Sequence, residues 1–171
     1  SNRIVIASDL KLELYDNASG NLLRSFVGHK GPVHSLSVSP DGGTLLSGSH
    51  DQTIRMWDLN AESKIQSPML NFFFTQDARD WIAWTEEGYY AASYGGEDLI
   101  GWQINQGPDQ PAQYVAAWQY EKTLRRPDIV ELIPTVRSTQ AAIDKLTADK
   151  PNAPSQSIDI SQDRDLLAVP R

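Results

Sequence analysis

The chain has 171 residues, of which 40% are hydrophobic, and this is enough to form the core of one or two globular domains. Its 22 acidic and 15 basic side chains give a net charge of -7, which disfavours binding to nucleic acids. Because it has no cysteine, the sequence excludes disulfides, thiolate zinc sites and cysteine nucleophiles within these residues. No apolar run approaches the ~20 residues that cross a bilayer. We therefore expect a cytoplasmic protein that binds neither nucleic acid nor membrane.

A repeated pattern of short strands runs through the first hundred residues. Residues 5–16 read VIASDLKLELYD, and 42 residues later residues 47–58 read SGSHDQTIRMWD. Trp102 follows Trp57 by 45 residues. Each unit contains a β-prone run, a turn with Gly or Asp, a second run ending in an aromatic residue, and a polar connection. A period of 40 to 45 residues with this texture predicts repeated, meandering antiparallel sheets.

Turn sequences separate the predicted strands at matching places. Residues 39–43, SPDGG, combine a proline that presets φ with glycines that accept positive φ. Residues 86–88, EEG, occupy the same place one unit later. This alignment places residues 35–38 and 81–84 on equivalent strands.

The central unit carries a motif that resembles the WD-repeat family. Gly28-His29 is followed 28 residues later by Trp57-Asp58, with SGSHD between them. The resemblance implies an all-β fold, with about two and a half four-stranded propeller blades over residues 3–106. The flanking units depart from the pattern, since Tyr15-Asp16 has no preceding Gly-His and Trp102 is followed by Gln103.

Three residues of the central unit are the residue types of a hydrolase triad: His29, Ser47 and Asp51. The resemblance to WD repeats implies a different role, in which they join Trp57 in a buried, hydrogen-bonded structural tetrad. A sheet buried on both faces must pair its polar groups, and a catalytic serine would also need exposure and an oxyanion hole. We therefore expect no catalytic residue in the chain.

Other candidate residues are better explained by turns and loops than by chemistry. His34 and His50 lack a carboxylate partner at ligand spacing, so solvated loop histidines are favoured over a metal site. The pairs Glu86-Glu87 and Glu97-Asp98 fall in predicted turns. We expect neither a metal nor a cofactor.

A helical extension is predicted over residues 107–147. Apolar and aromatic residues in the segment 112–124 recur at helical spacing, and they include three candidate partner-binding residues, Tyr114, Trp118 and Tyr120. This helix either docks on the propeller or stays free to bind a partner.

Two shorter helices are predicted to follow. One spans residues 128–133 and ends at Pro134, and the other begins after the N-cap Ser138 and ends near Lys145 or Thr147. Residues 148–171 are predicted to be a linker or a disordered tail.

A narrower resemblance covers residues 81–133. The string WIAWTEEGYYAASYGGEDLIGWQIN, followed later by RRPDIVELI, is similar to the propeller ends of bacterial proteins that combine WD repeats with caspase-like peptidase domains. It implies an alternative function, in which the chain is a regulatory or sensing fragment of such a peptidase and catalysis lies outside it.

The predicted strands are too few for a complete propeller. Propellers contain about 4 to 8 blades, so about two and a half cannot close a ring. We expect other segments or chains to supply the remaining blades, or several copies to assemble. The leading hypothesis is a non-catalytic protein-interaction scaffold whose partners are proteins.

Overall fold

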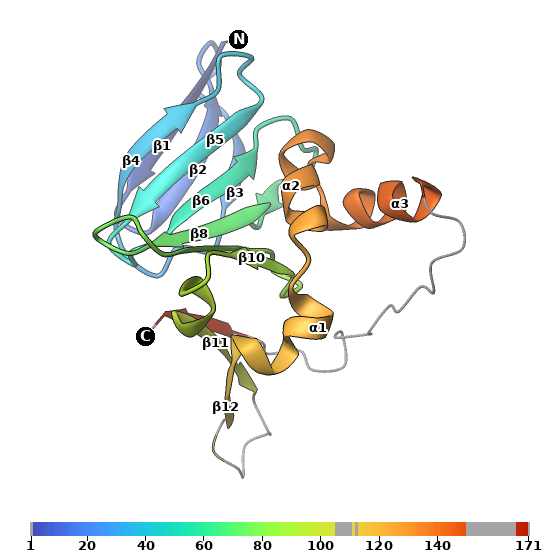
Figure 1. Ribbon diagram of the computed structural model, residues 1–171. Helices are drawn as coiled ribbons and strands as arrows, with labels where there is room; N and C mark the ends of the chain where they lie inside the picture. Colours follow the sequence, from blue (N-terminus) through green and yellow to red (C-terminus); the bar gives the residue numbers. More distant parts are fainter. Residues whose placement is uncertain (1, 105–110, 112, 150–166, 171) are drawn as a thin grey trace. The chain divides into compact units, whose positions relative to one another are not determined.

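The computed structural model describes residues 2–104, 111, 113–149 and 167–170. The chain forms two compact units, Ser1–Phe72 and Phe73–Arg171 (Figure 1). The division falls inside one strand, β8 (Leu70–Phe74).

The first sheet of the first unit has the strand order β1-β2-β3-β7. Its strands are β1 (Arg3–Ser8), β2 (Lys11–Asp16), β3 (Leu22–Phe26) and β7 (Ile65–Gln66). Neighbours are antiparallel except β3 and β7, which are parallel. In β2, Leu12 and Leu14 are buried and Glu13 lies between them, so the strand presents one apolar face to the core.

The second sheet continues the meander. In the first unit it contains β4 (Val33–Val38), β5 (Thr44–Ser49), β6 (Ile54–Asp58) and the start of β8, in that order. The predicted turn at residues 39–43 joins β4 to β5, where the Gly42 amide donates to the Ser39 carbonyl at 2.8 Å. Gly42 has a φ of 69°, which explains why glycine suits this position.

The two sheets of the first unit pack face to face. Their shared core contains Leu12, Leu14, Phe26, Leu45, Trp57 and Leu59. The rings of Phe26 and Trp57 meet edge to face, with centroids 5.4 Å apart. Two stacked, mostly antiparallel sheets are the arrangement of neighbouring propeller blades, and the predicted fold class, an all-β partial propeller with short C-terminal helices, is confirmed.

The second unit begins with a hairpin. The end of β8 lies next to β9 (Trp81–Trp84), which pairs with β10 (Tyr90–Ala92) across the predicted turn at residues 86–88. A 3-10 turn, η1 (Gly96–Asp98), then leads to β11 (Ile100–Ile104), which lies between β12 (Gln113–Ala116) and β13 (Leu167–Pro170). β13 falls within residues 148–171, which the sequence predicted to be a linker or a disordered tail.

The predicted helix over residues 112–124 is wrong for residues 113–116. Residues 113–116 form β12, and only η2 (Ala117–Tyr120) and α1 (Glu121–Leu124) are helical. Tyr114 and Val115 are strand formers, and pairing with β11 satisfies their backbone. Val115 is buried and Tyr114 is exposed, so the apolar spacing reflects strand alternation followed by a tight turn.

The two following helices are longer than predicted. Helix α2 spans Pro127–Val136 and contains Pro134, so the prediction that this proline ends the helix is wrong. A proline in the last turn removes a single hydrogen bond, while Ile129 and Ile133 remain buried on one helix face. Helix α3 spans Thr139–Asp149, and the predicted N-cap is confirmed, since Ser138 Oγ accepts from the Ala141 amide at 3.1 Å.

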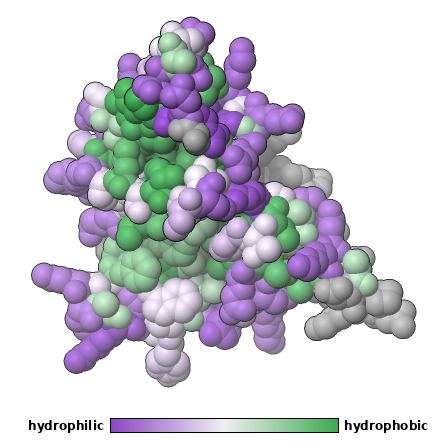
Figure 2. All heavy atoms as spheres, turned by 90° about the horizontal axis from the view of Figure 1, so that it is seen from above, coloured by the Kyte–Doolittle hydropathy of each residue, from purple (hydrophilic) through white to green (hydrophobic). Residues whose placement is uncertain are grey.

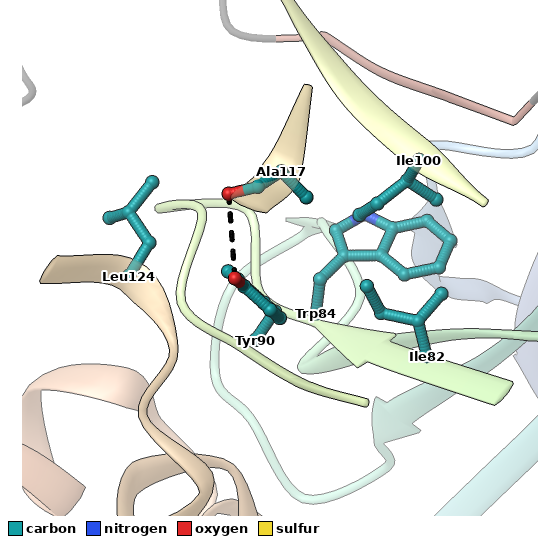
Figure 3. Close-up of a cluster of buried hydrophobic side chains, with 6 residues drawn as sticks. All are labelled: Ile82, Trp84, Tyr90, Ile100, Ala117 and Leu124. Carbon is teal, nitrogen blue, oxygen red and sulfur yellow. Dashed lines mark hydrogen bonds between the residues drawn. The ribbon is translucent and has the colours of Figure 1, made fainter. Parts of the chain in front are cut away.

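The second unit has its own core (Figure 3). Its buried members are Ile82, Trp84, Tyr90, Ile100, Ala117 and Leu124. The Tyr90 hydroxyl donates to the Ala117 carbonyl at 3.4 Å, and Arg125 forms a 2.8 Å ion pair with Glu97. The first contact holds η2 against β10, and the second joins the end of α1 to η1. None of the helices in the described residues is long and apolar enough to span a membrane.

Candidate functional site

The site lies within the first unit, on the segments that surround β5. His29 precedes β4, Ser47 lies on β5, Asp51 lies in the turn between β5 and β6, and Trp57 lies on β6. Antiparallel pairing of β4, β5 and β6 brings these residues together although they span 29 positions of the chain.

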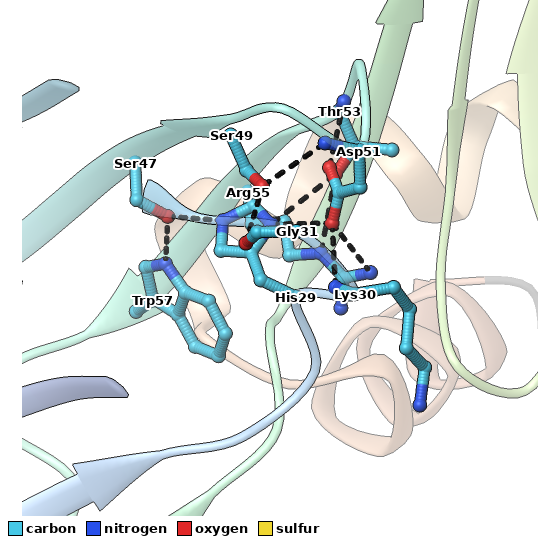
Figure 4. A network of polar contacts seen from close by, with 9 residues as sticks. All are labelled: His29, Lys30, Gly31, Ser47, Ser49, Asp51, Thr53, Arg55 and Trp57. Atoms are coloured by element: carbon cyan, nitrogen blue, oxygen red, sulfur yellow. Dashed lines mark hydrogen bonds and ion pairs between the residues drawn. The ribbon is translucent and has the colours of Figure 1, made fainter. Parts of the chain in front are cut away.

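A continuous hydrogen-bonded chain joins the four side chains (Figure 4). Trp57 Nε1 donates to Ser47 Oγ at 2.8 Å. Ser47 Oγ lies 2.8 Å from His29 Nε2, and His29 Nδ1 lies 2.8 Å from Asp51 Oδ2. The residues that the sequence predicted to form a tetrad are therefore in direct contact.

One proton arrangement satisfies the whole chain. If Nδ1 of neutral His29 carries the proton and donates to Asp51, Nε2 accepts from the Ser47 hydroxyl, which in turn accepts from Trp57. Burial lowers the pKa of His29, although the hydrogen bond and charge of Asp51 act in the opposite direction. This favours the neutral imidazole that the chain requires.

Asp51 is held ionised by a second set of donors. Burial acts to raise the pKa of Asp51, but hydrogen bonds from Thr53, Lys30 and His29 hold it well below its ordinary value. Thr53 Oγ1 donates to Asp51 Oδ1 at 2.6 Å, and the Lys30 amide donates to Oδ2 at 2.8 Å. A guanidinium nitrogen of Arg55 also lies 3.9 Å from Asp51 Oδ2.

Sequence reasoning did not single out Lys30, Thr53 or Arg55. The signal for Thr53 was present, because an aspartate that accepts from the amide two residues ahead forms an Asx turn, and the Thr53 amide donates to Asp51 at 2.9 Å. Arg55 carried no comparable signal. Its burial depends on the close approach of Gly28, where an added Cβ would collide with the guanidinium.

The geometry of Ser47, His29 and Asp51 matches a hydrolase triad, but its accessibility does not. Ser47 is 1% exposed, and both the donor and the acceptor capacity of its hydroxyl are engaged. A nucleophile must reach its substrate, whereas this hydroxyl faces the packed sheets. Within the described part of the chain, no three histidine, cysteine or acidic side chains gather in a way that could hold a metal ion.

The candidate partner-binding residues lie in the second unit. Tyr114, Trp118 and Tyr120 are 44%, 57% and 39% exposed. They follow one another along β12 and η2. The side chain of Tyr94, another aromatic residue of this unit, is fully exposed.

Sequence comparison identifies the repeat that contains the tetrad. Residues 20–58 match the family described as WD domain, G-beta repeat. This segment runs from the end of the β2–β3 turn to the end of β6, and it includes His29, Ser47, Asp51 and Trp57. The resemblance to WD repeats is confirmed for this segment.

Longer similarities extend to eukaryotic proteins. The chain is 35% identical to striatin of Homo sapiens over 96 residues, which is 56% of this chain and 12% of striatin. It is 32% identical to striatin-3 of Homo sapiens over 96 residues. It is also 32% identical, over 116 residues, to the periodic tryptophan protein 2 homolog of Schizosaccharomyces pombe, or 63% of this chain. The matched region spans 12% of the length of each of these relatives.

Proposed function

We propose that this chain is a non-catalytic part of a protein-interaction scaffold, and that His29, Ser47, Asp51 and Trp57 form a structural tetrad. The observation that carries the proposal is the burial of Ser47 between two stacked sheets. Hydrogen bonds there link the side chains in the order Trp57, Ser47, His29 and Asp51. Such a network fixes the orientation of β4, β5 and β6 and presents the turns at the sheet ends as rigid loops. The similarity to WD-repeat proteins supports the same role.

A labelling experiment tests the non-catalytic assignment. A fluorophosphonate probe modifies activated serines, and we expect no labelling of Ser47 in the folded chain. The Ser47→Ala variant is the control for background labelling. Labelling that is lost in this variant would show that Ser47 is a nucleophile.

We also propose that further strands and blades complete the assembly. β1 lies at the edge of its sheet, and Leu36 and Val38 of β4 are exposed. Apolar side chains also show at the surface among polar ones (green in Figure 2). An edge strand beside exposed apolar residues is a place where another segment or chain adds a strand. Native mass spectrometry tests this, because a stable monomer of the isolated chain would contradict it.

The exposed aromatic residues of the second unit are the proposed partner-binding surface. Large aromatic side chains carry much of the energy of protein interfaces, and Trp118 is the most exposed of the three predicted residues. Once cross-linking mass spectrometry has identified a partner, Trp118→Ala should weaken its binding by about 2 kcal/mol. Ile65→Ala, a change at an exposed residue of the first unit, is the matched control. Equal affinities for the two variants would place the interface elsewhere.

The second candidate is a regulatory fragment of a caspase-like peptidase. The string that resembles such proteins, residues 81–133, lies entirely within the second unit. Sequencing the gene regions that flank the segment encoding this chain tests this candidate. A flanking domain with a paired catalytic histidine and cysteine supports it, and the lack of such a domain contradicts it.

A further inference from the structure

Two of the three histidines of the chain form a stacked pair at one end of the second sheet. The ring centroids of His34 and His50 are 4.1 Å apart and their planes are inclined by 22°. Both residues are exposed. They are 16 positions apart in the sequence, so the sequence spacing alone gives no ligand motif.

A bulge in β4 creates this pair. Val33 is opposite Ser49 and Ser35 is opposite Gly48, so β4 has one additional residue, His34, at this point. A bulge changes the direction in which its side chains point. The His50 side of the pair is fixed by the backbone, since the His50 amide donates to the Pro32 carbonyl at 2.9 Å and Ser49 Oγ donates to the Gly31 carbonyl at 2.8 Å.

The ring nitrogens of the pair are accessible, in contrast to those of His29. Both nitrogens of His29 are engaged, by Ser47 and Asp51. No other side chain or backbone group in the described part of the chain holds the nitrogens of His34 and His50. A shared metal ion requires one nitrogen of each ring at about 2.0 to 2.1 Å, so the two exposed side chains must turn from their stacked arrangement to bind it.

We propose that His34 and His50 form an open two-histidine site for a first-row transition metal ion of the Cu²⁺, Ni²⁺ and Zn²⁺ group. Imidazole is a preferred ligand of these ions, whereas Mg²⁺ and Ca²⁺ require oxygen ligands. No third histidine or acidic side chain in the described residues joins the pair, so water or a group from a binding partner completes the coordination. The site is separate from the buried tetrad and is independent of the scaffold function.

Calorimetric titration of the full chain, without a histidine tag, tests the proposal. We expect one Cu²⁺ per chain, with affinity decreasing from Cu²⁺ to Ni²⁺ and Zn²⁺ in the order typical of nitrogen ligands, and no binding of Mg²⁺. Because two linked ligands bind far more tightly than one, His34→Gln and His50→Gln should each weaken Cu²⁺ binding roughly 100-fold. Lys30→Gln, at a neighbouring exposed turn, should leave the affinity unchanged.

A second readout separates loss of the site from loss of the fold. Neither histidine is buried, so both variants should keep the unfolding midpoint of the parent chain. In NMR spectra, substoichiometric Cu²⁺ should broaden the imidazole signals of His34 and His50 more strongly than those of the buried His29. Equal affinity of the parent chain and the His34→Gln/His50→Gln double variant, or broadening centred elsewhere, would overturn the proposal.

Discussion

The guanidinium of Arg3 donates a 2.6 Å hydrogen bond to the carbonyl oxygen of Leu59, 56 residues further along the chain. Arg24 reaches the same segment, since its Nε donates to the Ser63 carbonyl at 2.7 Å and its Nη1 donates to the Asp58 carbonyl at 3.1 Å. Two arginines of the first sheet thus satisfy carbonyl groups of the last residue of β6 and of the segment that follows it. They link the first sheet to the second near the end of β6.

Arg24→Met should destabilise the first unit by about 2 to 4 kcal/mol, because it leaves two carbonyl groups without their donor. Arg24 is 7% exposed, so water cannot easily replace the lost bonds. Arg3→Met is the comparison and should cost about 1 kcal/mol, since Arg3 is only half-buried. Urea unfolding followed by tryptophan fluorescence measures both, and a smaller effect for Arg24 than for Arg3 would contradict this account.

Trp57→Ala should cost about 3 to 5 kcal/mol of the free energy of unfolding. The change removes a fully buried ring that contacts Phe26 and takes the indole donor away from Ser47. Trp118→Ala removes an equally large side chain that is 57% exposed, and it should cost less than about 0.5 kcal/mol. Thermal unfolding of the two variants provides the comparison, and equal midpoints would show that the tetrad does not stabilise the sheet.

The tetrad should make the free energy of unfolding increase with pH. The pKa values of His29 and Asp51 are both lowered by folding, so the folded state binds fewer protons than the unfolded state. Their contribution to stability is complete above a pH of about 6.5 and is lost as the pH falls, first through His29 and then, below about 4, through Asp51.

The Asp51→Asn variant separates the contribution of Asp51 to this pH dependence of stability from that of the other carboxylates. The variant should be less stable than the parent chain at pH 7, because the amide cannot replace the charge that Thr53, Lys30 and His29 stabilise. The difference should shrink as the pH falls below about 4, because the carboxyl group of the unfolded chain then takes up a proton while Asp51 of the folded chain stays ionised. Urea titrations at pH 7, 5 and 3 measure it, and a constant difference would rule out the ionised Asp51.

Gly31→Ala should destabilise the turn that carries Asp51 by about 1 to 3 kcal/mol. A Cβ at residue 31 would lie 2.7 Å from the Asp51 amide nitrogen and 3.1 Å from the His50 carbonyl carbon, and these backbone atoms cannot move independently. Gly42→Ala is the matched control, because its Cβ would meet nothing within 4 Å. Gly42→Ala should lower the free energy of unfolding by about 1 kcal/mol, because alanine is strained at a φ of 69°. Amide NMR shifts at Asp51 should therefore change for Gly31→Ala alone.

The sequence predicted the central repeat well because each level of information agreed there. The alternation in residues 53–57, the turn at residues 39–43 and the spacing of Gly28-His29 from Trp57-Asp58 all indicate the same sheet. The four tetrad side chains lie within this one repeat, so their proximity followed from its hairpins. Arg3 and Arg24 could not be predicted as partners of the β6–β7 connection, since no local pattern records a contact across 34 to 56 residues.

The C-terminal helices show where local patterns are insufficient. The spacing of Tyr114, Val115 and Trp118 fits both a helix stripe and a strand followed by a 3-10 turn, and pairing of β12 with β11 decides between them. Likewise, Pro134 is a helix breaker in isolation, but the buried side of α2 tolerates it near the helix end. The stacked pair of His34 and His50 depends on a bulge that leaves no signal in the residue types.

The parallel pairing of β3 with β7 joins residues 25 and 65, whereas β4, β5 and β6 are linked by short hairpins. Local contacts form early in folding, and the closure of a long loop is slower because it costs more entropy. The hairpins that carry Ser47 and Trp57 should therefore form the folding nucleus, and β7 should dock last. Weakening the β3–β7 pair should then speed unfolding and leave the folding rate nearly unchanged.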